Sequence, residues 1–222
     1  MALYNLFNGV PSIGPDADTT SVSLGTEFVV TAACWVTQIR WFKPFGGTSN
    51  IRVGGLYKVS GSSGSLVVGP VNIPNPEGGT WGAADVPPYR LEVGGRYRAV
   101  IFHPGGRYPA SGGYFTTGPG ASNIVRGPVT VPNAANSAAQ GAYTYSESLV
   151  YPVETYNGGA YFSDITITDV DPNPVEDTRA SVGVRTEGGW VTERAKVSYL
   201  NEDRQWTEGK LKYWTGSGWS TP

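Results

Sequence analysis

Short runs of apolar and β-branched residues alternate with clusters of turn-forming residues in the first part of the chain. The clusters are rich in glycine, serine, asparagine and proline. Runs of this length with such boundaries are typical of β-strands joined by tight turns. We therefore predict four successive strands, over Val22–Thr31, Trp35–Lys43, Arg52–Val59 and Ser65–Ile73.

Alternation within a run indicates which side chains share a face of the strand. In the second run, Thr37, Ile39 and Trp41 fall on one face, and the polar residues between them fall on the other. A further run, Arg96–His103, is apolar on both faces in its second half, as expected of a strand that is covered on both sides. The Gly94-Gly95 pair before it predicts a turn that leads from Leu91–Val93 into this strand.

Composition favours the same fold class. Glycine contributes 31 residues and proline 17, while aromatic residues make up 12% of the chain, a level that indicates a packed interior. Many short strands with turn signals between them predict an all-β fold, a jelly-roll-like β-sandwich. The net charge of −2 gives no basic surface for nucleic acid. We expect the single cysteine, Cys34, to be a buried free thiol.

The character of the chain changes near Asp171, which predicts two regions, residues 1–170 and residues 171–222. The second region holds 15 of the 34 charged residues and four of the seven tryptophans. A piece this small and polar cannot bury a good core of its own. We expect a C-terminal β-ribbon extension for attachment or oligomerisation, with these candidate assembly residues: Trp190, Trp206, Tyr213, Trp214 and Trp219.

The sequence offers little catalytic chemistry, and we predict that the protein is not an enzyme. A histidine-assisted nucleophile has only His103 as its base, and no Gly-x-Ser-x-Gly turn is present. A phosphate-binding glycine loop is missing as well. No spacing among the acidic residues singles out the carboxylate pair that glycoside hydrolysis requires.

Metal and cofactor signals are equally weak, and we predict neither. One histidine and one cysteine cannot supply an ordinary zinc site. The acidic stretch that begins at Asp169 starts like a calcium loop, but Pro174 stands where that loop needs glycine. Asp16, Asp18 and Asp164 remain candidate ligands of a structural calcium ion, without a motif that supports one.

Aromatic residues in glycine- and proline-rich stretches are the most distinctive functional signal. Amphipathic rings on loops suit sugar stacking or protein contacts, because they offer contact area at low entropic cost. The alternative is that these rings cover the ends of the sandwich. The residues in question are Trp81, Tyr89, Tyr108, Tyr114, Tyr143, Tyr145, Tyr156 and Tyr161.

A series of strand and turn motifs, in this order, resembles domain-of-unknown-function family 4082 over roughly residues 4–168. Each motif is weak alone, but many recur together. They are Val22-x-Leu24-Gly25-Thr26-x-Phe28, Val36-Thr37-x-Ile39-Arg40-Trp41-Phe42-Lys43, Gly55-Leu56-Tyr57, Trp81, Pro87-Pro88, Leu91-x-x-Gly94-x-x-Tyr97, His103-Pro104-Gly105-Gly106-Arg107-Tyr108-x-Ala110, Tyr114-Phe115, Gly141-x-Tyr143 and Ala160-Tyr161-Phe162-x-Asp164-Ile165.

The resemblance implies a domain similar to carbohydrate-binding β-sandwiches, found in bacterial surface proteins and in virions of actinobacterial phages, with no catalytic residues. The family pattern falls on four residues that are expected to lie near one another, and Trp81 is placed with them. The candidate contacts for a glycan or partner are therefore Trp81, His103, Arg107, Tyr108 and Tyr114.

Together these features predict a structural component of a tailed bacteriophage virion, such as a minor tail protein, that contacts the host surface. The N-terminus lacks a signal peptide, so synthesis in the host cytoplasm is expected. Residues 212–219 also resemble endings of phage minor tail proteins. The expected partners are other virion proteins, further copies of this chain and a cell-surface glycan, with no nucleic acid and no membrane insertion. The alternatives are a carbohydrate-binding module and a capsid decoration protein.

Overall fold

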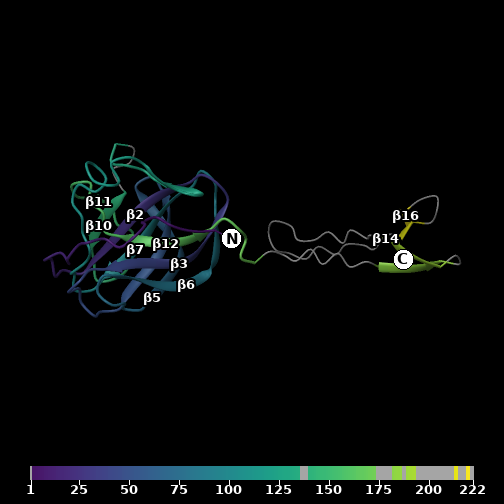
Figure 1. Ribbon diagram of the computed structural model, residues 1–222, viewed down its shortest axis with the longest axis horizontal. Helices are drawn as coiled ribbons and strands as arrows, with labels where there is room; N and C mark the ends of the chain where they lie inside the picture. Colours follow the sequence, from purple (N-terminus) through teal and green to yellow (C-terminus); the bar gives the residue numbers. More distant parts are fainter. Residues whose placement is uncertain are drawn as a thin grey trace. The chain divides into compact units, whose positions relative to one another are not determined.

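The computed structural model describes residues 2–135 and 140–173, together with the backbones of four short strands between residues 182 and 220. The chain divides into two compact units, residues 1–173 and residues 174–222. No helix in the described part of the chain is long and apolar enough to cross a membrane. The regular elements of the first unit are all strands (Figure 1): β1 (Leu3–Asn5), β2 (Val22–Val30), β3 (Cys34–Lys43), β4 (Arg52–Ser60), β5 (Ser63–Ile73), β6 (Thr80–Leu91), β7 (Arg96–His103), β8 (Ile124–Arg126), β9 (Val129–Val131), β10 (Gly141–Tyr145), β11 (Glu154–Thr155) and β12 (Ser163–Thr168).

These strands form two antiparallel sheets. The four-stranded sheet has the order β1-β12-β3-β6. The eight-stranded sheet has the order β11-β10-β2-β7-β4-β5, while β9 pairs with β2 and β8 pairs with β9. The chain crosses repeatedly between the sheets, because β3 and β6 belong to one and β2, β4 and β7 to the other. The predicted all-β sandwich is therefore confirmed.

The core lies between the two sheets. Ile39 and Ile165 of the four-stranded sheet and Ile101 of the eight-stranded sheet are fully buried in one cluster. The thiol of Cys34 lies in the same cluster, as predicted. A Cβ atom at Gly54 of β4 would lie only 2.6 Å from Ile39 Cγ2, so the sheets approach too closely there for any side chain.

The five predicted strands are present as β2, β3, β4, β5 and β7. The predicted alternation in β3 is wrong at Thr37, because the strand bulges there: Val36 and Gln38 face consecutive residues of β12. A bulge shifts the side-chain alternation by one position. Val36 therefore joins Ile39 and Trp41 in the core, and Thr37 is only partly buried.

The predicted Gly94-Gly95 turn is also present, and it carries the chain from one sheet to the other. Gly94 has a φ of +81°, which favours glycine, and the N–H of Gly95 donates to the carbonyl oxygen of Glu92 at 2.9 Å. The strands on either side, β6 and β7, belong to different sheets. The turn thus connects an edge strand of the smaller sheet to a central strand of the larger sheet.

A strap of residues 146–153 crosses the outer face of the eight-stranded sheet and connects β10 to β11. Pro152 packs over Gly25 of β2, where a Cβ atom would lie 2.8 Å from its ring. Arg98 of β7 donates to the carbonyl oxygen of Pro152 and, at 2.7 Å, to Glu27 Oε2. Arg98 and Glu27 are both buried, and their ion pair joins β7 to β2. The bond from Arg98 to Pro152 attaches the strap to this pair.

A buried carboxyl group attaches the N-terminal segment to β12. Asp164 Oδ1 accepts hydrogen bonds from the N–H groups of Leu6 and Ile165, both at 2.7 Å. The guanidinium of Arg40 lies 3.7 Å from Asp164 Oδ2. Burial raises the pKa of Asp164 to about 7, although Arg40 and the backbone N–H groups oppose this shift.

The second unit contains two short antiparallel ribbons in its described backbone. In the first, β13 (Val182–Thr186) pairs with β14 (Gly189–Glu193), and in the second, β15 (Tyr213–Trp214) pairs with β16 (Trp219–Ser220). Of the candidate assembly residues, Trp206 lies outside the described residues. The other four are in these strands: Trp190, Tyr213, Trp214 and Trp219.

Candidate ligand-binding pocket

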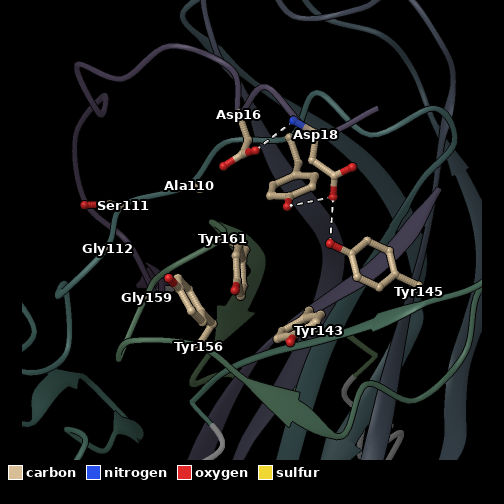
Figure 2. Close-up of a pocket in the computed structure, with 11 residues that line it drawn as sticks. Asp16, Asp18, Ala110, Ser111, Gly112, Tyr143, Tyr145, Tyr156, Gly159 and Tyr161 are labelled. Carbon is tan, nitrogen blue, oxygen red and sulfur yellow. Dashed lines mark hydrogen bonds between the residues drawn. The ribbon is translucent and has the colours of Figure 1, made fainter. Parts of the chain in front are cut away.

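A pocket of about 420 Å³ opens at the surface of the first unit, where four separate segments meet (Figure 2). Five tyrosines and two aspartates dominate its lining. This volume lies within the range of about 300–1,000 Å³ that is usual for small-molecule sites. The lining residues are Asp16, Asp18, Tyr108, Ala110, Ser111, Gly112, Tyr143, Tyr145, Tyr156, Gly159 and Tyr161.

The two aspartates stand on the loop before β2, which is tied to the loop after β7. The N–H of Asp16 donates to the carbonyl oxygen of Tyr108, and the N–H of Arg107 donates to that of Asp18, both at 2.8 Å. Gly106 has a φ of +62°, and a Cβ atom there would lie 2.3 Å from the carbonyl oxygen of Asp18. Glycine at this position is thus required for the two loops to approach each other.

Both oxygens of the Asp18 carboxylate accept hydrogen bonds. Its Oδ1 accepts from the N–H of Thr20 at 2.8 Å. Its Oδ2 accepts from the hydroxyls of Tyr145 and Tyr108 at 2.8 and 3.3 Å, and Figure 2 marks both of these bonds with dashed lines. Burial raises the pKa of Asp18, but these hydrogen bonds outweigh it and hold the pKa below the ordinary value. Asp18 is therefore a stable negative charge in the wall of the pocket.

Strand β10 supplies two of the tyrosines. Tyr143 and Tyr145 are two residues apart, so their side chains lie on the same side of the strand. The rings are in edge contact, with centroids 5.7 Å apart. The hydrogen bond to Asp18, and then burial, raise the pKa of Tyr145. The second strand from one edge of the larger sheet thus presents two neighbouring rings to the pocket.

The segment between β11 and β12 supplies the remaining two tyrosines. Backbone hydrogen bonds of 2.9 and 3.0 Å between Ser111 and Ala160 join this segment to the loop after β7. The side chain of Tyr156 is mostly exposed, whereas Tyr161 is 7% exposed. Burial, followed by the neighbouring tyrosines and Asp16, raises the pKa of Tyr161 to about 12. Among the described residues, none accepts or donates a hydrogen bond at the Tyr161 hydroxyl, although this residue lines the pocket.

Three of the sequence-predicted contact residues lie at or near this pocket. Tyr108 lines it. His103 lies behind Tyr108, with ring centroids 6.1 Å apart, and is fully buried; its Nδ1 accepts a hydrogen bond from Arg52 Nε at 3.0 Å. Burial, and then the charge of Arg52, hold the pKa of His103 well below its ordinary value. Arg107 is the neighbour of Tyr108 in the loop, held with a φ of 56°, and it does not belong to the lining.

The other two predicted contact residues, Trp81 and Tyr114, belong to an aromatic cluster around Phe7. The ring of Phe7 stacks with Trp81 at 6.4 Å and meets the edge of Tyr114 at 5.7 Å. Trp81 Nε1 donates to the carbonyl oxygen of Gly9 at 2.8 Å. These two side chains hold the N-terminal segment and do not line the pocket. The structure therefore separates the five predicted residues into two groups.

Several pocket residues were not among the predicted contacts. Tyr143, Tyr145, Tyr156 and Tyr161 carried the signal of an aromatic residue in a glycine-rich context. Asp16 and Asp18 were considered only as calcium ligands, and no local signal marks Ser111 or Gly112 as part of a site. In the described ranges, no three histidine, cysteine or acidic side chains gather into a metal-binding group. Asp164, the third calcium candidate, lies in the core and does not line the pocket.

Comparison with protein families supports the predicted resemblance. A family model described as a domain of unknown function (DUF4082) matches residues 8–163. The chain belongs to this family. All the residues that line the pocket lie within the matched part of this DUF4082 protein. No curated protein matches the chain.

Proposed function

We propose that the DUF4082 domain is a non-catalytic carbohydrate-binding module, and that the pocket shown in Figure 2 is its binding site. The observation that carries this proposal is the lining itself, which combines five tyrosine side chains with two carboxylates. Sugar rings combine an apolar face of C–H groups with hydroxyls at the edge. A tyrosine face suits the first part, and carboxylates and phenolic hydroxyls suit the second.

The state of the carboxylates supports binding rather than hydrolysis. A glycosidase needs a general acid, which is a carboxyl group with a raised pKa. Asp18 has a lowered pKa, and both of its oxygens are occupied by hydrogen bonds. Asp164, whose pKa is raised to about 7, is fully buried and does not line the pocket. Asp18 is thus unsuited to act as a general acid, and Asp164 is not placed to do so.

Glycan-array screening, followed by calorimetry with the best ligand, tests this proposal. Tyr156→Ala removes a mostly exposed ring, 71% accessible, at little cost to the fold. We expect it to weaken binding by about 1 kcal/mol, or roughly fivefold. Phe45→Ala is the matched control, because it removes an aromatic ring that is 64% exposed and lies outside the pocket. Absence of any glycan ligand, or equal loss with both variants, would refute the proposal.

We also propose that the protein serves as a structural component of a phage virion, in which residues 174–222 make the attachment to other copies or other virion proteins. The support is the division of the chain at residue 173, with 14 of the 34 charged residues and four of the seven tryptophans in the second unit. Light scattering on the full chain and on a chain ending at Asn173 tests this role. A defined oligomer that only the full chain forms is expected, and two monomers would contradict self-assembly.

A further inference from the structure

The charge of the pocket lining is one-sided. Two carboxylates, Asp16 and Asp18, line the pocket, and none of the eleven lining residues is lysine, arginine or histidine. These negative charges act on a neighbouring tyrosine. Burial is the largest cause of the raised pKa of Tyr108, and the charges of Asp16 and Asp18 are the next largest. Glu154, at the adjacent strand end, also forms a hydrogen bond that contributes, after burial, to the raised pKa of Tyr143. A negative potential in a partly enclosed site attracts cations and repels anions.

One carboxylate oxygen is left for a ligand. Asp16 Oδ1 accepts a hydrogen bond from the N–H of Asp18 at 2.9 Å. No described residue donates to the other oxygen of this carboxylate, in contrast to Asp18, both of whose oxygens are occupied. Figure 2 shows the Asp16 carboxylate at the upper side of the pocket, on the same side as Asp18. A hydrogen-bond donor with a positive charge would pair best with this oxygen.

The tyrosines add two further features that suit a cation. Their π faces carry partial negative charge, and aromatic rings arranged around a site are a recurrent means of binding ammonium groups. Tyr161, between Tyr156 and Tyr143 in the view of Figure 2, is more than nine-tenths buried and presents a hydroxyl without a partner among the described residues. An ammonium group can donate to the free oxygen of Asp16, and a hydroxyl elsewhere on the same ligand can bond to Tyr161.

We infer that the pocket selects sugars that carry a free, protonated amino group over N-acetylated and anionic sugars. This inference rests on the proposed carbohydrate binding and specifies the ligand class. A neutral amide in place of the amine leaves the Asp16 carboxylate desolvated without a compensating charge. A carboxylated or phosphorylated sugar brings a like charge against both aspartates. The pocket therefore discriminates by attracting sugars with a protonated amine and by repelling anionic sugars.

The test compares three oligosaccharides of equal length by calorimetry on the full chain at about pH 6, where an amine of ordinary pKa is protonated. They are glucosamine tetramer, N-acetylglucosamine tetramer and galacturonic acid tetramer. We expect the glucosamine tetramer to bind at least about tenfold more tightly than the other two. This preference should decrease at high salt, because screening weakens charge interactions.

Asp16→Asn is the decisive variant. Its amide oxygen can still accept the hydrogen bond from the N–H of Asp18, so the loop is retained while the negative charge and the free oxygen are lost. We expect it to lower affinity for the glucosamine tetramer about tenfold and to leave the weak binding of the N-acetylated tetramer unchanged. Glu77→Gln, which removes an exposed acid outside the pocket, is the charge-matched control and should change the affinity for neither tetramer. Tyr161→Phe provides a second variant that removes one hydroxyl without altering the ring.

The possible outcomes separate the two proposals. Equal or tighter binding of the N-acetylated or anionic tetramer overturns the amine selectivity and leaves carbohydrate binding in place. A preference for glucosamine that Asp16→Asn does not reduce overturns the assignment to Asp16. If no tetramer binds and the glycan array is also negative, carbohydrate binding itself is refuted.

Discussion

The buried carboxyl group of Asp164 makes the strongest prediction about stability, through the substitution Asp164→Asn. An amide has nearly the same shape as a protonated carboxyl group, and its oxygen can accept the hydrogen bonds that Asp164 Oδ1 receives from Leu6 and Ile165. The substitution therefore retains the attachment of the N-terminal segment. It removes the ability of this position to lose a proton.

The sign and size of the effect follow from the pKa of Asp164, which is about 7 in the folded protein against an ordinary value of 3.8. Between these two pH values the unfolded chain is ionised at this position while the folded protein keeps its proton. The wild type therefore loses stability as pH rises through this window, by about 1.4 kcal/mol per pH unit. The total over the window is about 4 kcal/mol, and solvent does not screen it because the side chain is fully buried.

Urea unfolding followed by tryptophan fluorescence between pH 4.5 and pH 8 measures this effect. The unfolding free energy of the wild type minus that of Asp164→Asn should be largest at the acidic end, fall towards pH 7 and then level off. Taking the difference cancels the titration of all other groups. Glu77→Gln, an exposed acid, should show no such trend. A difference that stays constant across this range would refute a raised pKa at Asp164.

Three further predictions concern the core. The pKa of His103 is held well below 6.5, so protonation below this pH favours the unfolded chain. The unfolding free energy of the wild type, relative to that of His103→Gln, should therefore fall as pH drops below about 6.5, by up to ~1.4 kcal/mol per pH unit. The same urea series would contradict this if the difference did not change with pH. Gly54→Ala should destabilise the protein by about 1–3 kcal/mol through overpacking against Ile39, whereas Gly14→Ala, which meets open space, should cost far less in thermal unfolding. Cys34 is fully buried, with a pKa raised to about 12, so a thiol reagent should label it only after denaturation, and rapid labelling of the native protein would contradict its burial.

The features that could be predicted from the sequence are those that depend on residues close together in the chain. Alternation and turn residues gave the fold class and the five predicted strands, and the order of motifs gave the family. The same reasoning singled out the tyrosines that line the pocket, because a ring in a glycine-rich stretch is recognisable locally. It failed at Thr37, where a bulge shifts the alternation and places Val36 in the core. The bulge is visible only in the register with β12.

The pocket itself was decided by tertiary structure. Tyr145 and Asp18 share a hydrogen bond although 127 residues separate them in the sequence, and no local pattern encodes that meeting. The same holds for the predicted contacts that lie away from the pocket, since Trp81 and Tyr114 pack against Phe7. The sequence determines which segments become strands and which become loops. Which loops meet at one end of a sandwich depends on strand order and register, and these are set by packing across the whole domain.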